Sequence, residues 1–197
     1  MSLLHQILQW DRELFNKLNG EWTNSFFDAV LPYTRNALVW TPLYLFFVVF
    51  AVLNYKRNGL LWVLFGVLAV ATSDIISSWG IKELVFRMRP CHDEALVGHV
   101  RFLVNYCPQS SGFTSSHASN HFALATFIFI TLKDHVNKWL RLIFFWALIV
   151  SYAQVYVGVH YPGDVICGSI VGVLIGFAWA KSFSRNFQLI NKVDSNF

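Results

Sequence analysis

The chain has 197 residues, of which 55% are hydrophobic, 17% aromatic and only 13% charged, and its formal net charge is +4. A soluble domain usually carries about 25% charged residues. The mean hydropathy of +0.47 is also more apolar than that of a typical soluble domain. The composition therefore predicts an integral membrane protein of one domain. Most basic residues fall in short loops, which indicates membrane topology rather than nucleic-acid binding.

The N-terminal segment is too polar to span a bilayer. Residues 3–18 place apolar side chains at helical spacing, with charged and amide residues on much of the other face. This pattern predicts an amphipathic helix at the membrane interface. A short second helix is expected over 22–35, capped by Asn24 or Ser25. The first residues lack a basic start, a long apolar core and a cleavage site, so no signal peptide is expected.

Four later runs approach the ~20 apolar residues that a bilayer requires, and a fifth is shorter but compatible with a helix throughout. The four are 37–55, 59–81, 139–159 and 162–183, and the shorter one is 118–132. The expected fold is all-α, a polytopic bundle of five transmembrane helices, or six if the N-terminal segments also cross. The expected division is an interfacial segment at 1–35, a transmembrane domain at 36–186 with an outer loop at 90–114, and a cytoplasmic tail at 187–197.

Lysine and arginine residues in short loops predict the orientation. They gather after the first, third and fifth spans, at Lys56, Arg57, Lys133, Lys138, Arg141, Lys181, Arg185 and Lys192. That side is expected to be cytoplasmic, so 82–117 and 160–164 face outward together. The outer loop nevertheless carries Lys82, Arg87, Arg89 and Arg101. These four either bind an anion or are solvated loop charges.

The second span ends in KELVFRMRP, residues 82–90. Lys82 and Arg89 are seven residues apart and share a face if the helix continues that far. Pro90 should end the helix at Arg89 and free its guanidinium for a ligand. A guanidinium beside an ammonium suits a phosphate, although basic residues at a helix end also extend to the interface without binding anything.

Small and hydroxyl residues precede the third span in GFTSSHASNHF, residues 112–122. Thr114 or Ser115 is expected to cap this helix, whose unpaired first amides would form an anion site. His117 in the first turn could donate a proton to a bound group. Plain capping, with His117 as a bystander, is the alternative.

The break between the last two apolar runs, SYAQVYVGVHYPGDVIC at 151–167, holds a histidine and an aspartate. Pro162 fits the first turn of the final span, and Asp164 falls within the same turn. Asp164 can accept from one imidazole nitrogen of His160 and leave the other free as a nucleophile or base. An interfacial histidine beside a capping aspartate is the alternative, but so many ionisable groups on one membrane face favour a shared site.

Metal and serine-hydrolase patterns are absent from the sequence, which has no HExxH, CxxC pair, carboxylate cluster or G-x-S-x-G. A metal site in the outer loop remains an alternative to ordinary surface residues, at His92, Asp93, Glu94 and His99. Cys91 and Cys107 flank that loop and would form a disulfide in an oxidising compartment, or stay as free thiols. Cys167 in an apolar run is expected to be a small core residue.

These segments resemble the motifs of the type 2 phosphatidic acid phosphatase superfamily of membrane lipid phosphatases. The first motif, Lys, six residues, then Arg-Pro, stands intact at 82–90. The second, Pro-Ser-Gly-His, is matched at 114–117 only in its Ser and His. The third, Ser-Arg, five residues, His, three residues, Asp, is matched at His160 and Asp164.

The resemblance implies a metal-independent phosphatase without a cofactor, whose partners are a membrane lipid phosphate and the bilayer, not nucleic acid. His160 would attack phosphorus and form a phosphohistidine, Asp164 would orient it, and His117 would protonate the leaving oxygen. The phosphoryl oxygens would be held by Lys82, Arg89, Gln154 and the amides of Ser115 and Ser116.

Two positions depart from the family pattern, since Ser116 replaces Gly and Gln154 replaces Arg. The lost charge could cost about 2–4 kcal/mol of transition-state stabilisation. The hypothesis is that Arg87 or Arg101 substitutes. The alternatives are adequate hydrogen bonding by Gln154, a slow enzyme, or a weakened protein that only binds anionic lipids. Asp74 within the second span is as well explained by packing as by function and is left outside the site.

Small bacterial members of this family commonly act on undecaprenyl diphosphate, phosphatidylglycerophosphate, phosphatidate or lipid A phosphates. The short chain makes undecaprenyl diphosphate the first expected substrate and lipid A the second. The expected place is a bacterial inner membrane, with the site facing the periplasm or outside. A haloperoxidase-like vanadate enzyme shares the motif pattern but would not need five spans.

Overall fold

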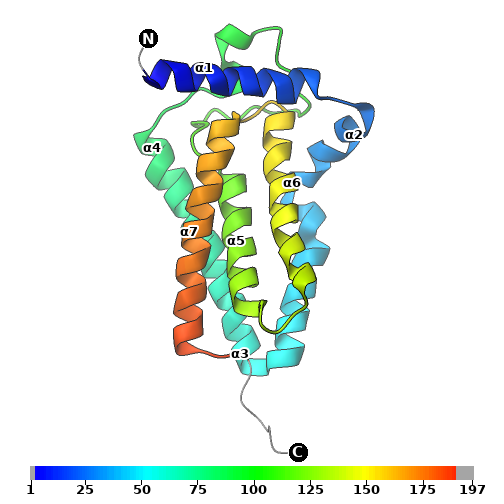
Figure 1. The fold of residues 1–197 in the computed structure, drawn as a ribbon, viewed down its shortest axis with the longest axis vertical. Helices are drawn as coiled ribbons and strands as arrows, with labels where there is room; N and C mark the ends of the chain where they lie inside the picture. The colour runs from blue at the N-terminus through cyan, green and yellow to red at the C-terminus, as the bar shows by residue number, and fades with distance from the viewer. Residues whose placement is uncertain (1–2, 190–197) are drawn as a thin grey trace, which may run out of the picture.

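The computed structural model describes residues 3–189, and within them the chain is all-helical, as the sequence predicts. Long helices run side by side, and α1 (Leu3–Asn16) lies across one end of the bundle (Figure 1). The bundle consists of α3 (Thr41–Ile75), α5 (Ser116–Leu132), α6 (Leu142–Tyr156) and α7 (Pro162–Asn186). The end of α6 and the start of α7 meet beneath α1, and the loop between α4 and α5 lies partly beneath α1 and partly beyond it (Figure 1).

The helix α3 consists of two arms that run in opposite directions (Figure 1). The backbone reverses at Lys56, where φ is 49°. Gly59 permits the turn, because a Cβ at this position would overlap the carbonyl of Ala51. These arms correspond to the helices predicted at 37–55 and 59–81, and a 3₁₀ turn at Ala37–Trp40 precedes the first.

The second arm of α3 ends earlier than the sequence suggested. It continues through a π-helical turn, Ile76–Ile81, into α4 (Lys82–Leu84), and the chain is then extended. The extended segment is held by the loop before α5, since the Arg87 amide donates to Ser111 Oγ at 3.0 Å and the Gly112 amide donates to the Arg87 carbonyl at 2.7 Å. The expectation that the helix reaches Arg89 is therefore wrong, and Lys82 and Arg89 approach from different elements.

The helices α5 and α7 pack with their backbones in close contact. Three glycines spaced four residues apart place one smooth face of α7 against α5. A Cβ at any of them would overlap backbone carbonyls of Ser115, Ser119 or Ala123, and the glycines are Gly168, Gly172 and Gly176. This packing joins the first turns of the two helices, so that the Ser115 amide donates to the Asp164 carbonyl at 3.0 Å.

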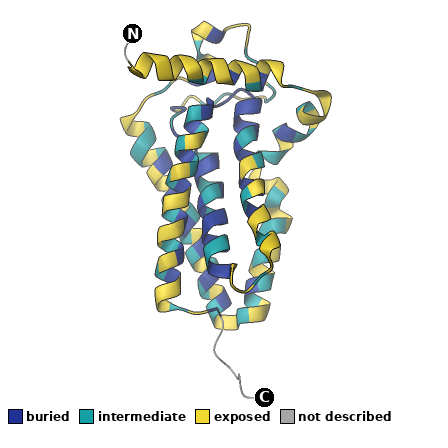
Figure 2. Ribbon diagram, viewed as in Figure 1, coloured by how far each residue is buried: buried dark blue, intermediate teal, exposed yellow. Residues whose placement is uncertain are grey.

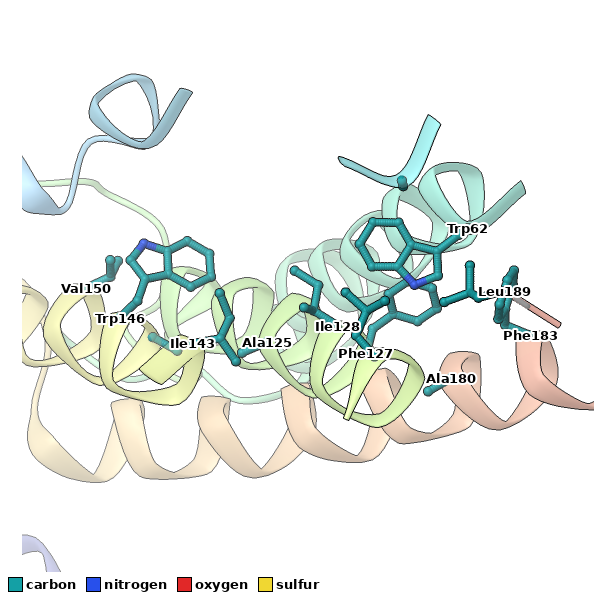
Figure 3. Packing of buried hydrophobic residues seen from close by; sticks show 13 residues of the cluster. Trp62, Ala125, Phe127, Ile128, Ile143, Trp146, Val150, Ala180, Phe183 and Leu189 are labelled. Carbon is teal, nitrogen blue, oxygen red and sulfur yellow. The ribbon is translucent and has the colours of Figure 1, made fainter. Parts of the chain in front are cut away.

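The main hydrophobic core fills the half of the bundle away from α1. Large side chains from α3, α5, α6 and α7 meet there, among them Trp62, Phe127, Ile128, Trp146 and Phe183 (Figure 3). Apolar residues on the two arms of α3 and on α7 pack around α5, whose residues are mostly buried (Figure 2). Polar side chains are thereby left to the end beneath α1.

The N-terminal segment is attached to that polar end. Phe15 of α1 is fully buried against Val155 and Tyr161. A π-helical turn at Lys17–Glu21 then leads to α2 (Ser25–Thr34). The predicted cap of this helix is confirmed, because Asn24 Oδ1 accepts from the Phe27 amide at 2.9 Å.

The outer surface of the bundle is apolar, as expected of a membrane protein. Among the described residues, three helical stretches are long and apolar enough to cross a membrane, namely Ala37–Leu84, Lys138–Tyr156 and Pro162–Asn186. Their outward faces are exposed, as at Leu53 and Leu174 (Figure 2). The helix α1 also exposes apolar residues, although its position at a membrane interface stays a prediction.

Candidate active site

The predicted nucleophile His160 lies between α6 and α7, 3% exposed. Its Nε2 is 2.9 Å from Nη1 of Arg89. Because a guanidinium can only donate, Nε2 must accept, so the ring proton belongs on Nδ1. Nδ1 faces Asp164 Oδ2 at 3.5 Å, too long for a good hydrogen bond, and it has no other partner among the described residues. The structure thus pairs Nδ1 with a carboxylate and points Nε2 at a cation.

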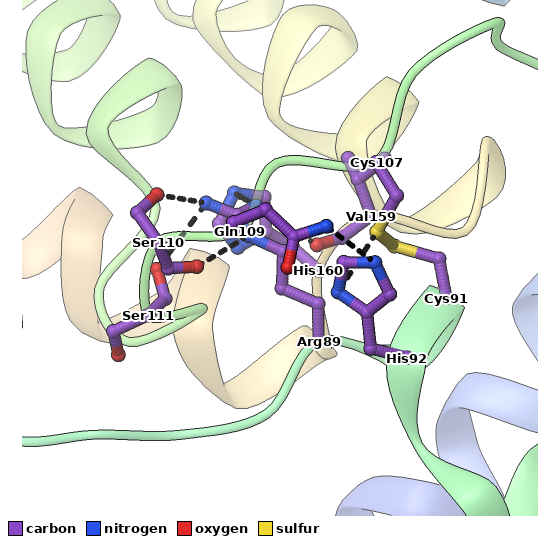
Figure 4. Close-up of a disulfide and its surroundings, with 9 residues drawn as sticks. All are labelled: Arg89, Cys91, His92, Cys107, Gln109, Ser110, Ser111, Val159 and His160. Atoms are coloured by element: carbon purple, nitrogen blue, oxygen red, sulfur yellow. Dashed lines mark hydrogen bonds between the residues drawn. A yellow bond between two sulfur atoms is a disulfide. The ribbon is translucent and has the colours of Figure 1, made fainter.

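Arg89 is fixed from several directions. Its Nε donates to the Ser110 carbonyl at 2.9 Å, and its Nη2 donates to the Ser111 carbonyl at 3.2 Å. Nη1 also donates to the Val159 carbonyl at 3.1 Å. Figure 4 shows the guanidinium between His160 and the loop that carries Ser110 and Ser111. A fixed, 4% exposed cation beside Nε2 is preorganised for an anion at that point.

Burial sets the protonation state of His160. Desolvation lowers the pKa of His160 to about 4, against a raising effect of Asp164 and a further lowering by the Arg89 charge. Burial also lowers the pKa of Arg89 to about 10, which still leaves it charged at neutral pH. His160 is therefore neutral at pH 7, as an attacking imidazole must be.

Lys82 reaches the site from α4 through a hydroxyl network. Its Nζ donates to Ser116 Oγ at 2.7 Å. Ser116 Oγ also lies 3.0 Å from Oγ of Ser77 and of Ser78. The hydroxyl that replaces the glycine of the family motif thus holds the ammonium at the N-terminus of α5.

The N-terminus of α5 differs in part from the expectation. Ser115 caps the helix, with Oγ accepting from the Ala118 amide at 3.4 Å. The Ser115 amide, which was expected to hold a phosphoryl oxygen, donates to the Asp164 carbonyl in this structure, so its role in phosphate binding stays a prediction. Within residues 3–189 the amides of Ser116 and His117 have no partner and remain available to an anion.

The side chain of Gln154 is fully buried and points back toward the backbone of its own helix, α6. Its Nε2 donates to the Val150 carbonyl at 3.4 Å, and its Oε1 has no partner in the described part of the chain. Its backbone carbonyl, in contrast, accepts from the His160 amide at 3.2 Å. The side chain forms no hydrogen bond to Lys82 or Arg89 across residues 3–189, so phosphate binding by Gln154 stays a prediction.

Neither arginine expected to replace the missing charge is free. Arg87 forms ion pairs with Asp164 at 2.7 Å and with Asp11 of α1 at 2.6 Å. Arg101 pairs with Asp28 of α2 at 2.6 Å. The hypothesis that one of them holds the phosphate is therefore not supported, because both guanidiniums are already engaged by carboxylates.

His117 lies at the head of an apolar groove. The groove has a volume of about 570 Å³ and runs between the arms of α3 and α5, from Ser116 and His117 to Trp62 and Phe127. Asp74 lines it and accepts from Asn120 Nδ2 at 2.9 Å. His160 acts electrostatically on His117, but it does not line this groove.

The outer loop contains a disulfide, with His92 beside it. Cys91, which directly follows Arg89-Pro90, forms the predicted disulfide with Cys107 (Figure 4). The one group of potential metal ligands among the described residues is His92 with these two bonded cysteines. Asp93 instead pairs with Arg12 at 3.0 Å. Cys167 is a free, half-buried thiol.

Two charged residues of the N-terminal segment were missed by the sequence reasoning. Asp11 contacts Arg87, and Arg35 at the end of α2 acts electrostatically on both Arg89 and His117. No motif includes them, and the only signal in the sequence was a charge in a segment predicted to lie at the membrane interface.

Comparisons with known proteins agree with this geometry. Residues 59–188 match the PAP2 superfamily, so the chain belongs to that family and is a membrane lipid phosphatase. A lipid A 4'-phosphatase of Bacteroides thetaiotaomicron is 30% identical over 82% of this chain and 72% of its own length. The undecaprenyl-diphosphatase BcrC of Bacillus subtilis is 29% identical over 54% of this chain and 51% of its own length.

The fold is also found in a solved structure. The crystal structure of Aquifex aeolicus LpxE has a TM-score of 0.64 and 22% identity, over 86% of this chain and 93% of that one. At this identity the likeness shows the helical arrangement alone. The match of residues 59–188 to the PAP2 superfamily confirms the resemblance inferred from the three motifs at the level of the family.

Proposed function

We propose that His160 is the nucleophile of this lipid phosphatase. Its Nε2 attacks phosphorus, a P–N bond forms, and the bond from phosphorus to the lipid oxygen breaks as His117 protonates that oxygen. Water then attacks the phosphohistidine, His117 takes the water proton, and phosphate leaves with His160 restored. The observation that carries this proposal is the placement of His160 between Asp164 on one nitrogen and Arg89 on the other.

Arg89, Lys82 and the amides of Ser116 and His117 hold the phosphoryl oxygens in this proposal. An oxygen entering beside Nε2 takes over the Arg89 Nη1 hydrogen bond that the imidazole accepts in the free protein. Donors already fixed by the fold need little rearrangement when charge develops, which is the main source of their effect.

Arg35 is the candidate for the charge that Gln154 lacks. It is half-buried, and within residues 3–189 its side chain has no carboxylate or hydrogen-bond partner. Burial lowers the pKa of its guanidinium. Ala37, two residues later, lines the groove that His117 heads. A desolvated cation without a counter-charge beside a phosphate site favours an anionic ligand.

The substrate we propose is a lipid A phosphate, with undecaprenyl diphosphate as the second candidate. This reverses the order expected from the sequence, because the lipid A 4'-phosphatase aligns over 82% of the chain and the BcrC diphosphatase over 54%. The apolar groove of about 570 Å³ beside His117 would hold part of a lipid chain.

The membrane arrangement that we propose has five spans, made by the two arms of α3 and by α5, α6 and α7. Residues 1–35 form an interfacial segment, 36–186 the phosphatase domain and 187–197 a cytoplasmic tail. The predictions for residues 1–2 and 190–197, including Lys192, lie outside the described residues. The site faces the periplasm or outside of a bacterial inner membrane.

The test is phosphate release by the purified protein in detergent, with lipid A, undecaprenyl diphosphate and phosphatidylglycerophosphate in parallel. We expect release from lipid A to be fastest, to continue in EDTA and to vanish in His160→Ala. Loss of activity in EDTA would contradict the metal-independent mechanism. A fully active His160→Ala protein would exclude the phosphohistidine, and a faster rate with undecaprenyl diphosphate would reverse the order of substrates.

A further inference from the structure

A chain of charges links α1 to the nucleophile. Asp11 Oδ2 is 2.6 Å from Arg87 Nη2, and Arg87 Nη1 is 2.7 Å from Asp164 Oδ1. The other carboxylate oxygen of Asp164 faces His160 Nδ1 at 3.5 Å. Asp11, Arg87 and Asp164 are 11%, 18% and 0% exposed in their side chains, so water screens these charges weakly. The helix α1, which none of the three motifs includes, therefore reaches Asp164 through Arg87.

The orientation of Arg87 keeps the two oxygens of Asp164 in separate roles. The guanidinium lies over the Tyr161 ring, 4.3 Å from its centroid. Of the two carboxylate oxygens of Asp164, it binds only Oδ1. Oδ2 accepts from the Tyr161 amide at 2.9 Å and remains beside His160. Arg87 is shared between two carboxylates, so the three groups together carry one net negative charge.

We propose that Asp11 is a positioning residue of this phosphatase: by sharing Arg87, it leaves Asp164 with a full negative charge toward His160. This rests on the proposed role of His160 as nucleophile. When Nε2 bonds to phosphorus, the imidazole becomes positively charged, and a nearby negative charge stabilises it. Without Asp11, Arg87 would neutralise Asp164, and much of that stabilisation would be lost.

The close approach of α1 to α7 depends on a contact between Asp11 and Gly163. The Gly163 amide donates to Asp11 Oδ1 at 2.7 Å. A Cβ on residue 163 would lie 2.8 Å from Asp11 Oδ2, so a larger residue would push the carboxylate away. Phe15, one turn further along α1, is fully buried and fixes the helix in place.

The test compares four purified proteins with the wild type, using phosphate release from lipid A, undecaprenyl diphosphate and phosphatidylglycerophosphate. They are Asp11→Asn, Gly163→Ala, the double variant Asp11→Asn/Arg87→Gln, and the control Glu13→Gln. Glu13 is exposed on the same helix and bonds only Gln9 among the described residues. We expect Asp11→Asn to lower kcat by about tenfold to a hundredfold with KM little changed. Gly163→Ala should lower kcat in the same direction, and Glu13→Gln should match the wild type.

The double variant separates positioning from folding. Removing Arg87 together with Asp11 restores the uncompensated charge of Asp164, so we expect a higher kcat than in Asp11→Asn. If Asp11 only held α1 in place, the double variant would be no more active, and both would show the same fall in thermal stability. Either that result or a wild-type kcat in Asp11→Asn would overturn the inference. An inactive wild type would instead mark failure of the proposed function.

Discussion

At the scale of single residues, both departures from the family motifs have structural consequences. Ser116 adds a hydroxyl that accepts from Lys82 at 2.7 Å, so the added side chain fixes a cation that is predicted to bind phosphate. Gln154 turns its amide to the Val150 carbonyl and leaves the site one charge short. Arg35, which has no partner among the described residues, acts electrostatically on Arg89 and on His117 from a segment that the motifs do not include.

Arg35→Gln is predicted to lower kcat/KM for lipid phosphate hydrolysis by about tenfold to a hundredfold, the loss of one hydrogen bond to a charged group. The measurement is steady-state phosphate release in detergent. Arg57→Gln is the matched control, because Arg57 is an exposed cation beside the reversal of α3. Wild-type kinetics in Arg35→Gln would show that this cation does not bind the substrate.

At the scale of elements, the contact between α5 and α7 aligns the two halves of the site. One helix carries His117 in its first turn and the other carries Asp164. Their register is fixed by the glycines of α7 and by the Ser115 amide, which donates to the Asp164 carbonyl. Stability and catalysis are therefore coupled at this interface.

Gly172→Ala is predicted to destabilise the protein by about 1–3 kcal/mol, because the added methyl would overlap the Ser119 carbonyl. Activity should fall with it, since the first turns of α5 and α7 move apart. Thermal unfolding in detergent measures the first effect. Gly80→Ala is the control, because a Cβ there meets nothing within 4 Å. Equal melting temperatures for the two variants would argue against tight packing at Gly172.

At the scale of the whole molecule, the two ends of the bundle differ in character. The turn of α3, the connection from α5 to α6 and the end of α7 share the end opposite α1 (Figure 1). These segments carry the basic residues that predict a cytoplasmic side. The disulfide and the predicted site residues share the other end, where an oxidising compartment would preserve the bond.

Labelling of single cysteines in intact spheroplasts tests this orientation. With Cys167 replaced by Ala, a cysteine at Val97, which is 77% exposed in the outer loop, should react with a membrane-impermeant maleimide. A cysteine at Arg57 should react only after the cells are opened, because it lies beside the turn of α3. Reaction at Arg57 in intact cells would reverse the proposed topology.

The sequence by itself determined the helical membrane class, the family and the disulfide, and it predicted His160, Asp164, Lys82 and Arg89 as site residues. These features follow from composition and from short spacings, which local backbone geometry and residue type make readable. The end of the helix at Leu84 was not predictable, because contacts with the loop before α5 decide it.

Only the tertiary structure decided which charges meet. Arg87 pairs with Asp11 across 76 residues, and Asp11 meets Gly163 across 152 residues. No periodicity or motif reports such a pairing, because it depends on how α1 lies over the ends of the bundle. The same packing engages the Ser115 amide and leaves Arg35 without a partner among residues 3–189, so long-range contacts fixed which residues are available to the proposed site.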